Sequence, residues 1–326
     1  MTALTDLDDL GDAVRRGGEF RAGGTDLMGR RAAGPHVDLR GLPGLTGLAW
    51  QPDGAVRIGA LTTVARVAAD ARLGAAHPCL ALTAAGLATP QIREVATVGG
   101  NLLQRNRCAY FRGPSFSCHQ NGGDHCPARA GLAPNAAIVD TGPCMAPHPS
   151  SLAVALLACD ALAEVHGGVR DDVRDDVRDD VRSGAPFPVG DLYGDGSDPT
   201  RDHLLGPGEI LLSVVLPPPV PGERAAYHRA IGRSEAEWPL VEAAARLVMD
   251  GGRITFARVA AGGVARVPVR LPEVEEALLA GEPLDRAAGL ATARCTPAAR
   301  NRYKLALLSG TVLEVLERAT GTAGHR

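Results

Sequence analysis

The chain has 326 residues, of which 45% are hydrophobic and 22% are charged, so it has enough apolar material for two or three globular domains. The net charge of −3 gives no reason to expect nucleic acid or an anionic membrane as a partner, and no run of about 18 apolar residues predicts a membrane span. Because residues 1–14 lack the basic and apolar regions of a secretory signal, we expect a cytoplasmic location.

The first part of the chain alternates short apolar runs with glycine-rich turns. We expect a strand over 20–22, a turn at Gly23-Gly24, a helix beginning at Thr25 and two further strands within 36–50. Pro52-Asp53-Gly54 lies between two apolar runs and predicts a β-hairpin. This mixture of short strands and helices differs from a regular βαβ Rossmann unit.

Helices and a long irregular region follow. Thr62 or Thr63 is a suitable N-cap for the next helix, which we expect as far as Leu73, and a second helix is expected over 78–88. Residues 98–148 are rich in glycine, cysteine and proline, and irregular stretches of this length inside a domain are usually functional. Beyond this region, the sequence predicts a helix followed by a strand.

The second half contains a repeat, a proline run and a terminal helix. Residues 169–182 repeat Val-Arg-Asp-Asp, which favours a solvated helix or a disordered insert without chemistry. A strand ends in the proline run 217–222, where we place a domain boundary. Two strands are expected around the Gly-Gly turn within 253–270, and a helix or helix pair capped by Thr296 ends the chain. The apolar stripe expected on that helix consists of Leu305, Leu308, Val312 and Leu316.

Two Gly-Gly motifs are the first candidates for ligand binding. Residues 22–27 place a glycine turn between a strand and a helix, where exposed backbone N–H groups and the helix N-terminus can hold a pyrophosphate. Residues 97–102 form a second such motif, and two turns of this kind can clamp a dinucleotide from both sides. The alternative for the first motif is a plain turn capped by Thr25 or Asp26.

Four cysteines fall within the irregular region, at Cys108, Cys118, Cys126 and Cys144, with 9, 7 and 17 residues between them. These spacings match neither the close pairs of structural zinc sites nor the common ferredoxin patterns. A thiolate-bound metal or cluster, plain cysteines and disulfides therefore all stay open. The arginines among the cysteines would favour thiolates and offset the negative charge of a cluster.

The motifs together resemble a known family. The stretches "RAGGTDLM" (21–28) and "TPQIREVATVGGNLLQRNRC" (89–108) are similar to the FAD-binding medium subunit of molybdenum-containing hydroxylases, the xanthine dehydrogenase and carbon monoxide dehydrogenase flavoprotein superfamily. The resemblance continues through 148–161, 205–219 and the C-terminal helix. The four-cysteine region is similar to the branch that contains the flavoprotein subunits of 4-hydroxybenzoyl-CoA reductase and periplasmic aldehyde oxidoreductase, whose members carry an extra [4Fe–4S] cluster there.

This resemblance implies the residues of two cofactor sites. The implied cluster ligands are Cys108, Cys118, Cys126 and Cys144, and the implied FAD-binding residues are Ala22, Gly23, Gly24, Thr25, Asp26, Leu27, Thr97, Gly100, Asn101, Gln104, Asp160, Leu205 and Arg229. Two positions depart from the family's pattern. Glu94 stands where the family often has asparagine, and Arg229 stands where a lysine is usual, which keeps the charge but changes the geometry.

The fold that the resemblance implies is α+β. It consists of a two-part FAD-binding domain of the PCMH or vanillyl-alcohol-oxidase type, over 1–54 and 55–218, with the cysteine region at 104–148 and the repeat at 169–182 inserted in the second part. A C-terminal domain over 219–326, like that of the carbon monoxide dehydrogenase flavoprotein, would contain a three-stranded sheet and helices.

The function that the resemblance implies is electron transfer within a molybdenum hydroxylase complex. A large partner subunit would oxidise an aldehyde, xanthine or aromatic-type substrate at molybdopterin, and a small partner would relay electrons through two [2Fe–2S] clusters. FAD on this chain would pass them to an acceptor, so no catalytic residue is expected here. A heterotrimer or its dimer is expected, and a partner could carry an export signal to the periplasm.

Two other functions stay open from the sequence. One is a self-contained FAD-dependent oxidase or dehydrogenase of the vanillyl-alcohol type. The other is a non-redox module that binds zinc at the cysteines.

Overall fold

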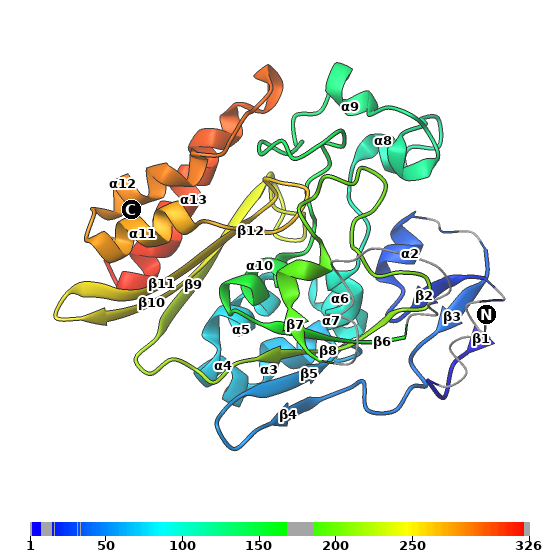
Figure 1. Ribbon diagram of the computed structural model, residues 1–326, viewed down its shortest axis with the longest axis horizontal. Coiled ribbons are helices and arrows are strands. Elements are labelled where there is room, and N and C mark those ends of the chain that lie inside the picture. The colour runs from blue at the N-terminus through cyan, green and yellow to red at the C-terminus, as the bar shows by residue number, and fades with distance from the viewer. Residues whose placement is uncertain are drawn as a thin grey trace.

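The computed structural model describes residues 2–7, 15, 17–30, 32, 34–167 and 185–322. These residues form three separate β-sheets, which contain three, five and four strands. Figure 1 shows the N-terminal strands at one side, the C-terminal sheet and its helices at the other, and the cysteine region above both. The Val-Arg-Asp-Asp repeat at 169–182 lies outside the described residues.

The first sheet is small and parallel. Its strands are β1 (Thr2–Ala3), β2 (Glu19–Arg21) and β3 (His36–Asp38), and β3 lies in the middle. The short helix α2 (Thr25–Arg30) follows β2 through the turn at Gly23-Gly24, so the predicted strand, turn and helix are present, with the strand one residue earlier. Leucines from the segments that follow β1 and β3 bury the inner face of this sheet.

The second sheet has five strands in the order β4-β5-β8-β6-β7. The predicted hairpin is present, because β4 (Leu48–Trp50) pairs with β5 (Val56–Gly59) in antiparallel register across residues 51–55. This hairpin carries residues 48–50, which we expected in the first subdomain, into the second sheet. The remaining strands are β6 (Leu162–His166), β7 (Phe187–Pro188) and β8 (Ile210–Leu216), and the 3₁₀ turn η2 (Val189–Leu192) follows β7.

A layer of short helices packs against this sheet around one apolar core. Thr63 caps the first of them as predicted, since its hydroxyl accepts a hydrogen bond from the N–H of Arg66. The expected single helix through Leu73 is wrong, because Asp70 ends one helix and caps the next with its carboxylate. These helices are α3 (Val64–Ala69), α4 (Ala71–Ala76), α5 (Pro78–Gly86), α6 (Pro90–Val95), α7 (Val98–Leu102) and α10 (Ser151–Ala158).

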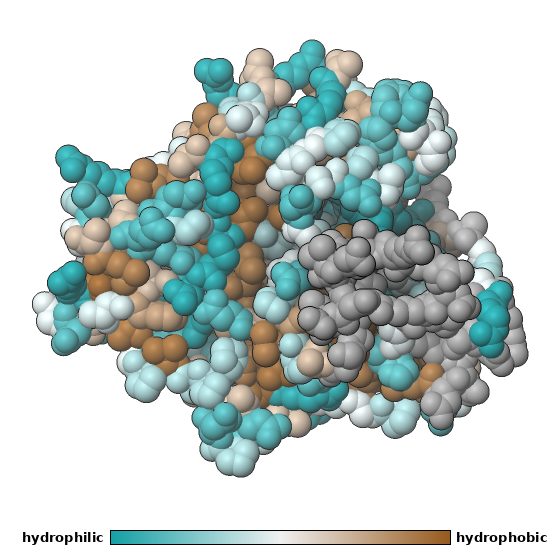
Figure 2. Space-filling view, in the orientation of Figure 1, coloured by the Kyte–Doolittle hydropathy of each residue, from teal (hydrophilic) through white to brown (hydrophobic). Residues whose placement is uncertain are grey.

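The third sheet lies in the C-terminal part of the chain and is antiparallel, with the order β12-β11-β10-β9. The described residues thus give it four strands where three were expected, since the two-residue β12 extends its edge. Its strands are β9 (Arg224–Ala230), β10 (Val241–Asp250), β11 (Arg253–Gly262) and β12 (Val269–Arg270). In the space-filling view, apolar side chains gather in a band beside this sheet, while the cysteine region above it is mostly hydrophilic (Figure 2).

Helices α11 (Pro272–Ala280), α12 (Leu284–Gly289) and α13 (Tyr303–Thr320) cover one face of this sheet (Figure 1). The stripe expected on α13 is present, because Leu308, Val312 and Leu316 are buried and Leu305 is partly buried. The expected cap at Thr296 is wrong: its N–H donates to the carbonyl of Ile138, and α13 begins only after a 3₁₀ turn. The 3₁₀ turns here are η3 (Leu290–Thr292) and η4 (Ala299–Asn301).

The cysteine region projects above the sheets and consists of loops joined by three short helical turns. These are α8 (Ala109–Arg112), η1 (His119–Asn121) and α9 (Pro127–Ala130). In the described part of the chain, none of the helices combines the length and apolarity needed to cross a bilayer.

Candidate functional site

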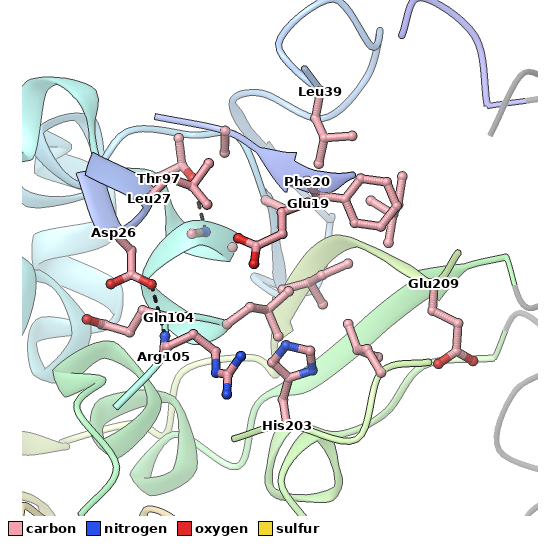
Figure 3. A pocket seen from close by; sticks show the side chains of 18 of the residues that line it. Glu19, Phe20, Asp26, Leu27, Leu39, Thr97, Gln104, Arg105, His203 and Glu209 are labelled. Carbon is pink, nitrogen blue, oxygen red and sulfur yellow. Dashed lines mark hydrogen bonds between the residues drawn. The ribbon is translucent and has the colours of Figure 1, made fainter. Parts of the chain in front are cut away.

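The two Gly-Gly motifs lie side by side and line one cavity of about 950 Å³; Figure 3 shows Leu27 and Thr97, from the two motifs, next to each other. One wall comes from β2 and α2, the second from α7 and the residues after it, and the third from the segment 201–211. The predicted residues that line the cavity are Ala22, Gly23, Gly24, Thr25, Asp26, Leu27, Thr97, Gly100, Gln104 and Leu205. The structure therefore brings ten of the thirteen predicted FAD-binding residues to one cavity.

Glycine is required in the first motif because its backbone closely approaches the segment before the second motif. A Cβ atom on Gly23 would lie 1.8 Å from the carbonyl oxygen of Val95, two residues before Thr97. Gly24 has φ +77°, a conformation that L-residues rarely adopt. A Cβ atom on Gly100 would lie 3.0 Å from the Thr97 hydroxyl. The missing side chains thus let the two motifs approach and keep their backbone accessible.

The backbone N–H groups of two helix N-termini border this cavity. Gly24 and Thr25 stand at the start of α2, and Gly99 and Gly100 lie in the first turn of α7. The Thr97 hydroxyl caps α7 by accepting a hydrogen bond of 3.1 Å from the N–H of Gly100. The N–H groups of Val98 and Gly99 likewise already donate, to the carbonyls of Thr62 and Ala60. What α7 offers an anionic group such as a pyrophosphate is therefore the partial positive charge of its N-terminus, beside the first turn of α2.

A second cavity of about 140 Å³ adjoins the first and shares Thr25, Asp26, Gly100 and Gln104 with it. Two more predicted residues, Asn101 and Arg229, line this smaller cavity. Asn101 is held by the Ser150 hydroxyl, which donates to its Oδ1 at 2.6 Å, and by the Gln104 amide, which donates to its carbonyl at 2.8 Å. The two cavities together form one elongated site whose far end reaches the C-terminal domain at Arg229.

Asp26 lines both cavities, but its carboxylate is already bound by arginines. Arg107 and Arg112 lie at 2.9 and 2.8 Å, and Arg30 lies at 3.2 Å. Burial raises the pKa of Asp26, but these arginines and the N–H of Arg105 outweigh it and hold that pKa below its usual value. Asp26 therefore joins the first Gly-Gly motif to the beginning of the cysteine region.

Asp160 is the predicted FAD-binding residue that the structure does not bring to either cavity. Its backbone has φ +51°, and its carboxylate pairs with Arg258 at 2.8 Å and Arg270 at 2.7 Å. These contacts join the end of α10 to the strands of the C-terminal sheet. Asp160 is thus an interdomain ion-pair residue in this structure.

The cavity also contains residues outside the predicted FAD-binding set, notably Arg105, which the sequence indicated only for the cysteines, and His203; Figure 3 shows the two side by side. Burial lowers the pKa of His203 to about 4, so the imidazole is neutral at pH 7. Among the described residues, its buried Nδ1 has no hydrogen-bond partner. The feature of the sequence that could have indicated His203 is its position two residues before Leu205, which was predicted to bind FAD.

The four predicted cysteines line a separate small cavity, although up to 17 residues lie between neighbours in the sequence. Cys108, Cys118 and Cys126 each occupy the N-cap position of a helical turn, namely of α8, η1 and α9. This position directs first-turn N–H groups to the sulfur, as those of Tyr110 and Phe111 do at Cys108. The structure thus gathers the cysteines and supplies donors that favour thiolates.

The fourth ligand candidate, Cys144, is held close to Cys126. The two thiols share a hydrogen bond, which holds the pKa of Cys126 below and that of Cys144 above the usual value. Arg129 fastens α9 to the segment before Cys144, because its guanidinium donates to the Pro143 carbonyl at 2.7 Å and pairs with Asp140 at 2.8 Å. Within the described residues, no three His, Cys, Asp or Glu side chains converge so as to hold a single metal ion.

Aromatic side chains explain the unusual composition of this region. Tyr110 packs edge-on against Phe116 with ring centroids 4.9 Å apart, and its hydroxyl accepts from the N–H of Leu132 at 2.8 Å. A Cβ atom on Gly131 would lie 2.1 Å from that hydroxyl, so glycine is needed there. The aromatics therefore hold the cysteine loops together where regular structure is scarce.

Comparison with known proteins agrees with this geometry. The family model described as the FAD-binding domain in molybdopterin dehydrogenase matches residues 5–174, which is more than half of the chain, and the model of the carbon monoxide dehydrogenase flavoprotein C-terminal domain matches residues 225–319. The chain belongs to the FAD-binding subunits of the molybdenum hydroxylase family. This FAD-binding subunit is therefore an oxidoreductase component, as the resemblance implied.

Individual relatives support the same assignment. The FAD-binding subunit is 33% identical to the aldehyde oxidoreductase FAD-binding subunit PaoB of Escherichia coli K12, over 94% of this chain and 93% of PaoB. It is 27% identical to the carbon monoxide dehydrogenase medium chain of Afipia carboxidovorans, over 98% of this chain and 94% of that one. A carbon monoxide dehydrogenase structure from Hydrogenophaga pseudoflava shares the fold, with a TM-score of 0.73 at 22% identity and 99% and 97% coverage.

Proposed function

We propose that this subunit carries a [4Fe–4S] cluster in addition to FAD and transfers electrons between them inside a molybdenum hydroxylase complex. The observation that carries the proposal is the shared cavity of Cys108, Cys118, Cys126 and Cys144, next to the loop that forms the FAD cavity. The cluster would take one sulfur from each cysteine. FAD, when bound, supplies an acceptor that exchanges one or two electrons.

The residues of the elongated site fit FAD. The two glycine turns and their helix N-termini would hold the pyrophosphate, and the apolar Leu27 and Leu205 would pack against the flat parts of the cofactor. Asn101, Gln104 and Arg229 supply polar groups at the smaller end of the site. We leave Asp160 out of the proposed FAD-binding set because its carboxylate serves the two arginines of the C-terminal sheet.

The resemblance to the branch with an extra [4Fe–4S] cluster is what favours a cluster over zinc. A structural zinc site needs four ligands on one ion at about 2.3 Å from each sulfur. The four cysteines line one cavity, where the Cys126 and Cys144 thiols share a hydrogen bond. A [4Fe–4S] cluster would bind each cysteine through a different iron. The N–H groups at three of the cysteines would offset its negative charge.

The complex would have two further kinds of subunit. PaoB is named as an FAD-binding subunit and the Afipia carboxidovorans protein as a medium chain, so both are parts of larger enzymes. We propose a molybdopterin-binding large subunit and a small subunit with [2Fe–2S] clusters as partners, in a heterotrimer or its dimer. The large subunit would oxidise the substrate, and FAD on this chain would pass the electrons to an external acceptor.

The experiment that tests the cluster is an analysis of iron, sulfide, zinc and FAD on the purified complex, with Cys126→Ser as the variant. We expect about eight irons per heterotrimer, roughly four from the two [2Fe–2S] clusters of the small subunit and roughly four on this chain, and we expect Cys126→Ser to lose about half of the iron while FAD stays bound. Cys295→Ser is the matched control, since Cys295 lies outside the four-cysteine cavity and is half-buried. Zinc in place of iron, or iron unaffected by Cys126→Ser, would overturn the ligand assignment.

A further inference from the structure

Arg105 lies between the FAD cavity and the cysteine cavity. Its side chain lines the FAD cavity, where Figure 3 shows it beside His203. The same guanidinium donates to the amide oxygen of Gln120 and stacks over the ring of Phe111, 4.8 Å from the centroid. Gln120 and Phe111 both line the cysteine cavity. One cationic side chain therefore contacts the wall of each site.

A buried carboxylate fixes the position of this guanidinium. The Asp202 side chain is only 2% exposed and accepts from Nε of Arg105 at 2.8 Å. It also pairs with Arg266 at 2.9 Å, and Arg266 is itself 2% exposed. The backbone N–H of Arg105 donates to Asp26 at 3.1 Å, which ties the same residue to the first Gly-Gly motif. Arg105 is thus held from both sides and cannot move independently of either cavity.

The charge of Arg105 is only partly neutralised. Arg105 and Arg266 share the single carboxylate of Asp202; Arg266 is buried and is also close to the Asp198 carboxylate, whereas the Arg105 side chain is 26% exposed at the cavity. The neighbouring His148 and His203 are buried and neutral at pH 7. A charge in a poorly solvated interior acts on its neighbours far more strongly than the same charge in water. Any group that gains negative charge in either cavity is stabilised by it.

We propose that Arg105 is a shared electrostatic and positioning residue that raises the reduction potentials of both FAD and the cluster and fixes one site relative to the other. This inference rests on the proposed cluster. Reduction adds negative charge to either group, and a nearby fixed cation favours the reduced form. A single residue thereby shifts the two potentials in the same direction.

The test is a redox titration of the complete complex, in which flavin absorbance and cluster EPR are followed separately. Arg105→Gln should lower both midpoint potentials, and Arg105→Lys, which keeps the charge, should restore both. Two matched controls remove a charge from one side only. Arg30→Gln, next to Glu19 and Asp26, should shift the flavin, and Arg129→Gln, next to Asp140, should shift the cluster.

The outcomes separate this inference from the proposed function. A wild-type complex with no more iron than the partner's [2Fe–2S] clusters account for would overturn the cluster itself. A complex with iron and FAD in which Arg105→Gln leaves either potential unchanged would overturn the shared role of Arg105. If Arg105→Gln fails to take up a cofactor, Asp202→Asn provides the opposite perturbation. Removal of that carboxylate must raise both potentials, and unchanged values refute the inference.

Discussion

Lys304 is the only lysine in the chain, and the structure buries it completely. Its Nζ donates to the carbonyls of Asn135 at 3.0 Å, Ala136 at 3.2 Å and Gly263 at 2.7 Å. These bonds join the beginning of α13 to the end of the cysteine region and to the turn after β11. At all its other lysine or arginine positions the chain has arginine. The planar guanidinium of arginine is less suited than the ammonium of lysine to three convergent acceptors.

The change to test is Lys304→Met, which keeps an unbranched apolar stem and removes the ammonium. The Ala136 carbonyl retains Asn301 as a donor at 3.3 Å, whereas Asn135 and Gly263 lose the bond from Lys304. A buried carbonyl without its donor costs roughly 1–3 kcal/mol, so two cost roughly 2–6 kcal/mol. Burial of the ammonium, which lowers the pKa of Lys304 to about 8, offsets part of this. We expect a loss of about 3 kcal/mol in the free energy of unfolding.

Urea unfolding measures this loss, and Leu305→Met on the next residue of α13 is the control, for which we expect a change below about 1.5 kcal/mol. Amine-reactive labelling gives a second measurement. Because the chain has a single lysine, label beyond the α-amino group reports directly on the opening of this site. A loss below about 1 kcal/mol for Lys304→Met, or labelling of native Lys304 as fast as that of the α-amino group, would refute the reasoning.

Two further predictions concern FAD affinity and acid stability. Gly23→Ala should raise the FAD dissociation constant at least about tenfold, because its Cβ would lie 1.8 Å from the Val95 carbonyl. Gly29→Ala is the control and should leave the constant unchanged, since its Cβ would have neighbours no closer than 3.8 Å. Equal FAD affinities of the two variants would contradict this. Burial lowers the pKa of His77 to about 4. Between about pH 6.5 and 4, the unfolded chain therefore binds a proton that the folded chain does not. The free energy of unfolding falls on acidification by up to about 1.4 kcal/mol per pH unit. His77→Phe should flatten that slope in urea titrations at pH 7 and 4.5, and parallel slopes would count against it.

The features that the sequence predicted correctly depend on short-range physics. The hairpin at Pro52-Asp53-Gly54, the Thr63 cap and the stripe of Leu308 and Val312 each depend on residues within a few positions of one another. The Gly-Gly motifs belong to the same class, because a turn before a helix N-terminus is local. Their meeting at one cavity is not local, and we expected it because two such turns can clamp a dinucleotide from both sides.

The predictions that the structure does not bear out depend on longer-range packing. Thr296 does not cap α13 because the helix begins only at Tyr303, after a 3₁₀ turn at 299–301. Asp160 lies away from both cavities because Arg258 and Arg270 hold its carboxylate. The break at Asp70 is local but ambiguous, since a short polar residue can sit on a helix surface or cap a new helix.

The arginines of the cysteine region illustrate what tertiary structure adds. Their sequence positions suggested that they balance a cluster's charge. The structure instead pairs both Arg107 and Arg112 with Asp26, which lies about 80 residues earlier, so they share one carboxylate as Arg105 and Arg266 share Asp202. Arg105 differs because its side chain lines the FAD cavity and also contacts Gln120 and Phe111, which line the cysteine cavity. Its position depends on how two arginines, distant in the sequence, divide the carboxylate of Asp202, which no local pattern encodes.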